Sequence, residues 1–414
     1  MVAWGCAPVA QLDRAWGCGP QGRRFKSSRA YQPFPTPAVF PPCEPLGRRR
    51  ARRPAPSDEV KERNRAGPRS RKRAPEALGN VGGRRQVMER RGLHTGIWAW
   101  HKWSMGSLER LVGKIAPSLG FNWVVLEING RFAFKSHPEV RDPEPMTAEQ
   151  ARSLARLARA NGVTLVPMYN CLGHQSGIEH KSAMLRGHPE FNEAPEMDAS
   201  APDFYCPSWC PNHPEVNPLL FDLFDEMIDG FEAEAFHVGM DEVFVIGECP
   251  RCKGTPNWEL FAKAVNDYHG HLVGKRGVEM QMWGDRLLEA KAMGRGKWDA
   301  SANETHQAVD VIPKDIVMCD WHYDNWDDFP SVEFFVEKGF RVWPAGWNEV
   351  EAVRHFIEVA REQQSPKVLG YMATTWTDVN DVVAGLAGEP TDPKNKGIEK
   401  IVAAVRAGAE LSRD

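Results

Sequence analysis

From residue 91 onward, short apolar runs alternate with segments of helical periodicity. The apolar runs have the length and β-branched or aromatic content typical of buried strands; they lie at Leu93–Trp98, Trp123–Ile128, Thr164–Met168, Ala235–Val238, Glu279–Trp283, Ile316–Cys319, Arg341–Ala345 and Leu369–Thr374. The helical segments begin near Ser107, Thr147, Asn217, Asn257, Asp285, Ser331, Val350 and Asn395. This alternation predicts a parallel α/β sheet, closed into a (β/α)₈ TIM barrel.

One helix start is marked by a local motif. Thr147-Ala-Glu-Gln150 has the spacing of a capping box, with Thr147 as the N-cap and Gln150 at the third helical position. In a barrel of this kind, chemistry is carried by residues that follow the strands. We therefore expect the functional residues at the strand ends.

Residues 1–87 differ from the remainder of the chain. They are basic and rich in Pro and Gly, with RRR at 48–50 and little apolar periodicity, so we expect a disordered extension before a catalytic domain at 88–414. A basic arm for nucleic acid is one alternative. The interpretation we favour is a spurious start, because Val9–Ala15 and Arg23–Ala30 resemble the translation of a transfer-RNA gene, and we expect the native protein to begin near Met88.

The composition narrows the choice of partners and compartment. The formal net charge of −3 gives no reason to expect a polyanion, and no apolar run is long enough to span a membrane. We therefore expect no nucleic-acid and no membrane partner. The nine cysteines are clustered, which favours thiols or a metal in a reducing compartment over a secreted disulfide framework. The sequence thus predicts a cytoplasmic protein, with its oligomeric state open.

Two adjacent carboxylates, Asp241 and Glu242, follow the fourth predicted strand. Charged groups at the end of a buried strand are costly unless they have a role. Neighbouring side chains of a strand point to opposite sides, so both can serve one site only if the chain bends, which Gly239 permits. The alternative is a helix N-cap followed by a first-turn glutamate.

The motif around this pair resembles a known enzyme family. His237-Val-Gly-Met-Asp-Glu242 resembles the strand-four motif of family-20 glycoside hydrolases, the β-N-acetylhexosaminidases, and the run 236–247 is similar to their hexosaminidase D branch. The strand-three segment 166–174 and Trp376-Thr-Asp378 after the eighth strand resemble the same family. The likeness spans about residues 91–380 in the family's order.

The resemblance implies a retaining mechanism assisted by the substrate's own 2-acetamido group, with no catalytic cofactor. By carry-over, Glu242 is the general acid and base, and Asp241 orients the acetamido group. His174 is expected beside Glu242, where it would tune proton transfer; the alternative is a loop histidine bonded to backbone. Asn170 stands where many relatives carry Asp.

The resemblance also implies an aromatic sugar pocket and acidic groups that bind hydroxyls. Trp283, Trp376 and Tyr323 match the family's acetamido pocket, and the full predicted binding set is Glu127, Trp283, Trp321, Tyr323, Asp324, Trp347, Trp376 and Asp378. The main branch carries an Arg after the first strand, but residues 95–102 contain none. Glu127 or Arg131 would take over its contacts, which leaves glucosamine and galactosamine substrates both open.

Two close cysteine pairs indicate a metal site. Cys206 and Cys210 follow the third predicted strand, and Cys249 and Cys252 follow the fourth. The spacings resemble zinc knuckles, so four thiolates could hold a structural zinc ion; ordinary thiols or two strained disulfides are the alternatives.

The sequence therefore predicts an exo-acting β-N-acetylhexosaminidase whose partner is an amino-sugar glycoside. Two alternatives keep the same fold. One is a glycosidase acting on a different sugar, and the other is a non-catalytic carbohydrate-binding barrel.

Overall fold

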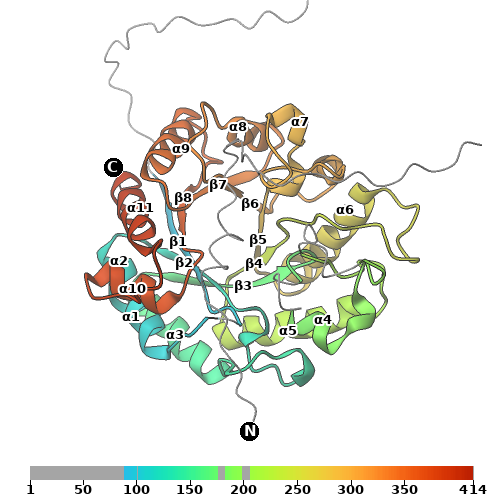
Figure 1. The fold of residues 1–414 in the computed structure, drawn as a ribbon, viewed down its shortest axis with the longest axis horizontal. Coiled ribbons are helices and arrows are strands. Elements are labelled where there is room, and N and C mark those ends of the chain that lie inside the picture. Colours follow the sequence, from blue (N-terminus) through green and yellow to red (C-terminus); the bar gives the residue numbers. More distant parts are fainter. Residues whose placement is uncertain (1–87, 100, 176–181, 198–205, 414) are drawn as a thin grey trace, which may run out of the picture. The chain divides into compact units, whose positions relative to one another are not determined.

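The computed structural model describes residues 88–99, 101–175, 182–197 and 206–413. The prediction for residues 1–87 lies outside the described residues. Eight parallel strands form a closed barrel in chain order: β1 (Arg90–Gly96), β2 (Trp123–Glu127), β3 (Thr164–Cys171), β4 (Ala235–Gly239), β5 (Glu279–Trp283), β6 (Val317–Trp321), β7 (Arg341–Gly346) and β8 (Gly370–Thr374). The predicted barrel is confirmed, and Figure 1 shows its strands inside a ring of helices.

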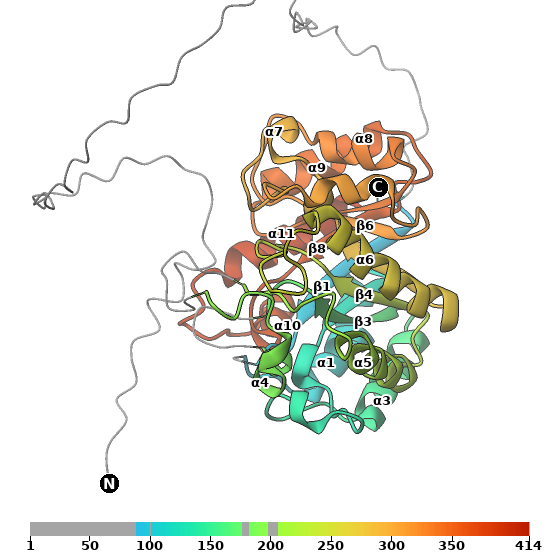
Figure 2. The same ribbon diagram turned by 90° about the vertical axis from the view of Figure 1, so that its right-hand side faces the viewer.

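The helices follow the strands around the outside of the barrel, as the two views show (Figures 1 and 2). They are α1 (Met105–Arg110), α2 (Ala116–Ser118), α3 (Ala148–Ala160), α4 (Ala183–Gly187), α5 (Val216–Phe231), α6 (Asn257–His269), α7 (Ala290–Met293), α8 (Pro330–Glu337), α9 (Val350–Glu362), α10 (Val379–Ala387) and α11 (Ile398–Leu411). None of the helices in the described residues is long and apolar enough to cross a bilayer.

The predicted capping box is present at the start of α3. Gln150 N donates to Thr147 Oγ1, and Thr147 N donates to the Gln150 side chain. These bonds satisfy two backbone N–H groups that the helix itself leaves without partners.

Two apolar layers hold the barrel together. The larger lies between strands and helices, and the smaller fills the interior of the barrel with residues such as Val125, Val166, Trp283, Trp343 and Met372. Because the strands are buried on both sides, most of their residues are apolar, which is why the sequence shows them as short apolar runs. The filled interior leaves the strand ends as the place for a site.

Candidate active site

The end of β4 bends as Gly239 allows. Gly239 has φ +68°, and a Cβ there would come within 2.1 Å of Asn170 Oδ1, so only glycine fits. Met240 and Glu242 also have left-handed backbones, with φ of +77° and +49°. The bend lets the neighbouring carboxylates of Asp241 and Glu242 face the same imidazole.

That imidazole belongs to His174, in the loop after β3. Its Nε2 lies 3.0 Å from Asp241 Oδ2 and 3.0 Å from Glu242 Oε2. The structure therefore brings together the three residues predicted to carry catalysis. Burial by itself raises the pKa of Asp241, but the charge and hydrogen bond of His174 outweigh it and hold the pKa below its ordinary value. Asp241 Oδ1 is buried and accepts no hydrogen bond from any described residue.

Asp285 is a residue that the sequence reasoning missed. It directly follows β5, and its Oδ2 accepts hydrogen bonds from the backbone N of Glu242 at 3.1 Å and from Arg286 Nε at 2.6 Å. Burial raises its pKa to about 6, against the opposing effect of Arg286. Its position two residues after Trp283, at a strand end, is the signal that could have identified it.

The predicted aromatic residues lie against one another. Trp283 and Trp376 have ring centroids 6.0 Å apart, and Trp376 Nε1 donates to Tyr323 Oη at 2.7 Å. Trp321 stacks on Tyr323 at 4.9 Å, and Trp347 meets Tyr323 edge-on at 5.5 Å. Burial raises the pKa of Tyr323, and the carboxylates of Asp241 and Glu242 add to the rise, so the aromatic group adjoins the acidic pair.

Two further aromatic rings join this group without having been predicted. His94, inside β1, lies 4.5 Å from Trp376, and Trp98 lies 5.9 Å from Trp376. Both are buried. His94 lies within β1, where the sequence pattern does not distinguish it from core residues, whereas Trp98 lies two residues after the strand, at a position where barrels place ligand contacts.

The predicted acidic ligands have different surroundings. Glu127, at the end of β2, accepts from Asn129 Nδ2 at 2.8 Å, and its other oxygen lies 3.5 Å from His94 Nε2. Burial raises the pKa of Asp324 in the loop after β6. Asp378 is the N-cap of α10: its oxygens accept from the backbone N of Asn380 and of Lys102, which favours a structural role over sugar binding.

The Arg131 side chain is bound by the protein backbone. Its guanidinium donates to the backbone carbonyls of Ala99, His101 and Pro143. Arg131 therefore fixes the segment after β1, and the expectation that it replaces the family's missing arginine has no support in these contacts.

The predicted four-cysteine site is wrong in one member. Cys210, Cys249 and Cys252 come together, but the fourth residue of the group is Glu193. Cys206 lies instead beside the expected catalytic residues, with its Sγ 3.4 Å from His174 Nδ1. Cys206 has a left-handed backbone, with φ +51°. The spacing of the cysteines in the sequence does not indicate this conformation, nor that Cys206 lies beside His174 and not beside Cys210.

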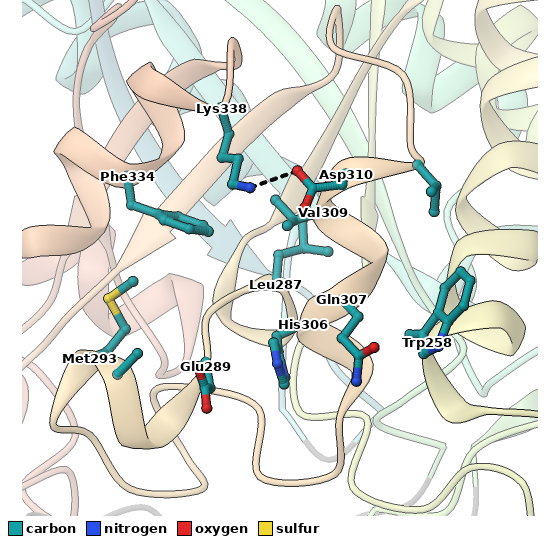
Figure 3. Close-up of a pocket in the computed structure, with 12 residues that line it drawn as sticks. Trp258, Leu287, Glu289, Met293, His306, Gln307, Val309, Asp310, Phe334 and Lys338 are labelled. Carbon is teal, nitrogen blue, oxygen red and sulfur yellow. Dashed lines mark hydrogen bonds and ion pairs between the residues drawn. The ribbon is translucent and has the colours of Figure 1, made fainter. Parts of the chain in front are cut away.

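A separate pocket of about 480 Å³ lies on the outside of the barrel, among α6, α7, α8 and the short helices Asp285–Leu287 and Thr305–Asp310 (Figure 3). Its lining includes Trp258, Glu289, His306 and an ion pair between Lys338 and Asp310. None of the strand-end residues described above lines it.

Comparisons with known proteins identify the family of this barrel. The sequence profile described as "Glycosyl hydrolase family 20, catalytic domain" matches residues 127–384. A curated protein named Beta-hexosaminidase, from Akkermansia muciniphila, is 22% identical over 251 residues, which are 56% of this chain and 48% of that protein. The chain thus spans about half the length of the curated relative it matches.

Solved structures share the barrel. The Flavobacterium johnsoniae chitobiase structure has a TM-score of 0.54 and 18% identity, over 78% of this chain and 51% of its own. A beta-N-acetylhexosaminidase from Bacteroides fragilis has a TM-score of 0.55 and 16% identity, over 78% of this chain and 65% of its own. At these identities the likeness supports the fold alone.

Proposed function

The chain belongs to glycosyl hydrolase family 20, and we propose that it is an exo-acting β-N-acetylhexosaminidase that releases terminal N-acetylglucosamine or N-acetylgalactosamine. The observation that carries the proposal is the approach of Asp241 and Glu242 to the same His174 nitrogen, 3.0 Å from each. A carboxylate pair beside a group of tryptophans is suited to cleaving a bond at a sugar ring.

In this proposal the substrate supplies the nucleophile. The acetamido oxygen attacks the anomeric carbon while Glu242 gives its proton to the leaving glycosidic oxygen, and an oxazolinium intermediate forms. Glu242, now a carboxylate, then takes a proton from water as that water attacks the anomeric carbon and restores the acetamido group. The configuration is retained because the anomeric carbon is attacked twice.

Asp241 is proposed to hold the acetamido N–H and to balance the positive charge of the intermediate. Its unpartnered and buried Oδ1 is an acceptor that a substrate N–H can satisfy. Its lowered pKa keeps it ionised at neutral pH, as this role requires. His174 is proposed to fix both carboxylates and to ease proton transfer at Glu242.

The aromatic residues are proposed to enclose the acetamido group and the sugar ring. Tyr323 Oη accepts a hydrogen bond from Trp376, so its own proton can be donated to the acetamido oxygen. Trp283 and Trp376 supply apolar walls, and Trp321 and Trp347 extend them. Glu127 and Asp324 are proposed to bind sugar hydroxyls, for which carboxylates are strong acceptors.

We also propose that the chain belongs to the hexosaminidase D branch, on the basis of the run 236–247 and the missing arginine after β1. A cytoplasmic location is proposed with it. Among the described residues, Cys171, Cys210, Cys249, Cys252 and Cys319 are free thiols, as is usual in a reducing compartment.

The experiment compares the full chain with Glu242→Gln on the p-nitrophenyl β-glycosides of N-acetylglucosamine and N-acetylgalactosamine. We expect kcat to fall by a factor of about 10² to 10⁴. Glu289→Gln, the same change in the outer pocket (Figure 3), is the control and is expected to keep full activity. Folded protein that is inactive on both sugars would refute the proposal, and a wider panel would then separate another glycosidase from a binding protein.

A further inference from the structure

A cluster of metal-binding side chains lies outside the residues assigned to catalysis. Glu193, Cys210, Cys249 and Cys252 are buried, and each offers a ligand atom within 4.8 Å of the others. Cys210 Sγ lies 3.4 Å from Cys249 Sγ and 3.4 Å from Cys252 Sγ. We propose that these four residues bind a structural zinc ion with three thiolates and one carboxylate.

The distances suit a shared ion. Tetrahedral zinc with Zn–S bonds of about 2.3 Å places sulfur atoms about 3.8 Å apart, close to the observed spacing. A disulfide needs sulfur atoms about 2.05 Å apart and joins only two of the three thiols. It would leave the third thiol and the Glu193 carboxylate buried together without a counter-ion, which is unfavourable.

The backbone holds the cysteine pair as a knuckle. In Cys249-Pro-Arg-Cys252, the backbone N groups of Cys252 and Lys253 both donate to the carbonyl of Cys249, at 3.0 and 2.9 Å. This tight turn brings the two sulfur atoms to one side of the loop after β4. Such a C-x₂-C turn is the common form of a zinc-binding half-site.

A second backbone arrangement supplies the other two ligands. Glu193 N donates to Ser208 O at 2.9 Å, and Cys210 N donates to Phe191 O at 2.7 Å, on either side of the antiparallel bridge Asn192–Trp209. These bonds fix Glu193 beside Cys210 before any metal binds.

Glu193 is oriented for coordination. Its Oε1 accepts from the backbone N groups of Gly247 and Glu248, at 2.8 and 3.1 Å. Its Oε2 is buried and takes part in no hydrogen bond among the described residues. One oxygen is thus held by the loop after β4, and the other is left to bind the ion. Hydrogen bonds of this kind to a ligating carboxylate hold it in the orientation that coordination needs.

The ion would join two loops that carry the active site. Cys210 lies in the connection after β3, which also carries His174, and the knuckle lies in the connection after β4, which also carries Glu242. With four protein ligands the ion has no open position, so its role is structural. The inference rests on the cluster alone and holds whether or not the sugar chemistry proposed above is correct.

The first test is metal analysis of the full chain, purified without chelator. We expect about one zinc per chain, released by a mercurial thiol reagent. Cobalt taken up by the metal-free protein is expected to show intense sulfur-to-cobalt charge-transfer absorption. Both measurements use the unaltered protein, so they do not depend on a variant that folds.

Variants then identify the ligands. Cys252→Ser and Glu193→Gln are expected to weaken zinc binding by more than the roughly 10- to 100-fold that the loss of an outer-shell partner costs. Cys206→Ser, in the same loop as Cys210, is the matched control and should keep its zinc. Folded protein with neither zinc nor cobalt uptake, or with a disulfide within the cluster, overturns the proposal. Loss of zinc in Cys206→Ser with retention in Glu193→Gln overturns this ligand set.

Discussion

The two ends of the barrel each hold a carboxylate that is largely shielded from solvent, but the two carboxylates differ in how many partners they have. At the amino end, Glu279 is the first residue of β5, and both of its oxygens are fully used. Arg90 binds it in a bidentate pair at 2.6 and 2.8 Å, Arg341 binds Oε2 at 2.6 Å, and Gln281 donates to Oε1 at 2.9 Å. Arg90 also lies over the Trp123 ring at 4.1 Å.

At the carboxyl end, Asp241 is buried more deeply than Glu279, but its Oδ1 receives no hydrogen bond within the described residues. Left-handed backbones gather in the same region, at Leu172, His174, Cys206, Gly239, Met240 and Glu242. A non-glycine residue in that conformation costs on the order of 1–3 kcal/mol.

The difference separates stability from function. The Glu279 network satisfies its own charges and needs no ligand, so it can only stabilise the fold. The carboxyl end has a buried acceptor, Asp241 Oδ1, without a donor, and a strained backbone. A ligand that donates a hydrogen bond to this acceptor would supply the missing contact. Substitutions at the two ends should therefore affect different measurements.

Among the variants that test this comparison, Asp241→Asn has the largest expected effect. We expect kcat to fall by a factor of about 10² to 10³, because the charge that stabilises the intermediate is lost. The melting temperature should stay unchanged or rise, because a buried charge beside Glu242 is removed. Enzyme assays and thermal unfolding of the same preparation measure both.

Asp310→Asn is the control for that variant, since Asp310 pairs with Lys338 in the outer pocket. It should keep its kcat. A large fall in the melting temperature of Asp241→Asn with unchanged kcat would reverse the comparison.

Arg90→Met should do the opposite. It leaves the partly buried Glu279 carboxylate with fewer partners, and we expect the free energy of unfolding to fall by about 1–3 kcal/mol. The kcat of the folded protein should not change. Urea unfolding at neutral pH measures the loss. Arg110→Met, which breaks the exposed pair with Glu389, should leave the melting temperature unchanged; a Tm shift as large as that of Arg90→Met would show that burial is not what matters.

The same network predicts a pH dependence of stability. Burial alone would raise the pKa of Glu279, but Arg90 and Arg341 lower it to about 2 from 4.5. A lowered folded-state pKa gives stability that is fully present above the unfolded value of 4.5 and is lost as the pH falls through about 2. The contribution is on the order of 3 kcal/mol. Urea unfolding between these pH values should show it, and Glu279→Gln should flatten the slope; an equally steep slope in that variant would assign it to other groups.

The fold was predictable because its pattern is local. Each strand is built around a short apolar run, so the eight strands could be placed to within a few residues. β1 begins at Arg90 rather than Leu93 because Glu279, distant in sequence, neutralises that arginine at the strand start. Helix α10 was not predicted from the sequence. Asp378 was predicted as a sugar ligand from its position after the eighth strand, and in the structure it caps the start of α10.

The site was predictable only where a motif marks it. The strand-end motifs led to Asp241, Glu242, His174 and the aromatic residues, all of which the structure brings together. Glu193 and Asp285 carry no motif, and their roles follow from contacts 54 and 43 positions away in sequence. Cysteine spacing likewise could not tell that Cys206 turns toward His174.

The smallest effect we predict tests whether position in the barrel or the use of a group decides its role. Thr147 lies after β2 and caps α3, so it is on the same end of the barrel as the active site, yet both hydrogen bonds of its capping box are made within the protein.

Thr147→Ala should lower the free energy of unfolding by about 1 kcal/mol and leave kcat and KM unchanged. Because the hydrogen bonds of Thr147 are made within the protein, its loss should affect stability rather than activity, as for Arg90, but to a smaller extent. Urea unfolding and steady-state kinetics measure both quantities, with Ser107→Ala, which keeps the N-cap Ser104 of α1, as a comparison. A change in kcat without a change in stability would mean that the whole carboxyl end, and not its unpartnered groups, is committed to function.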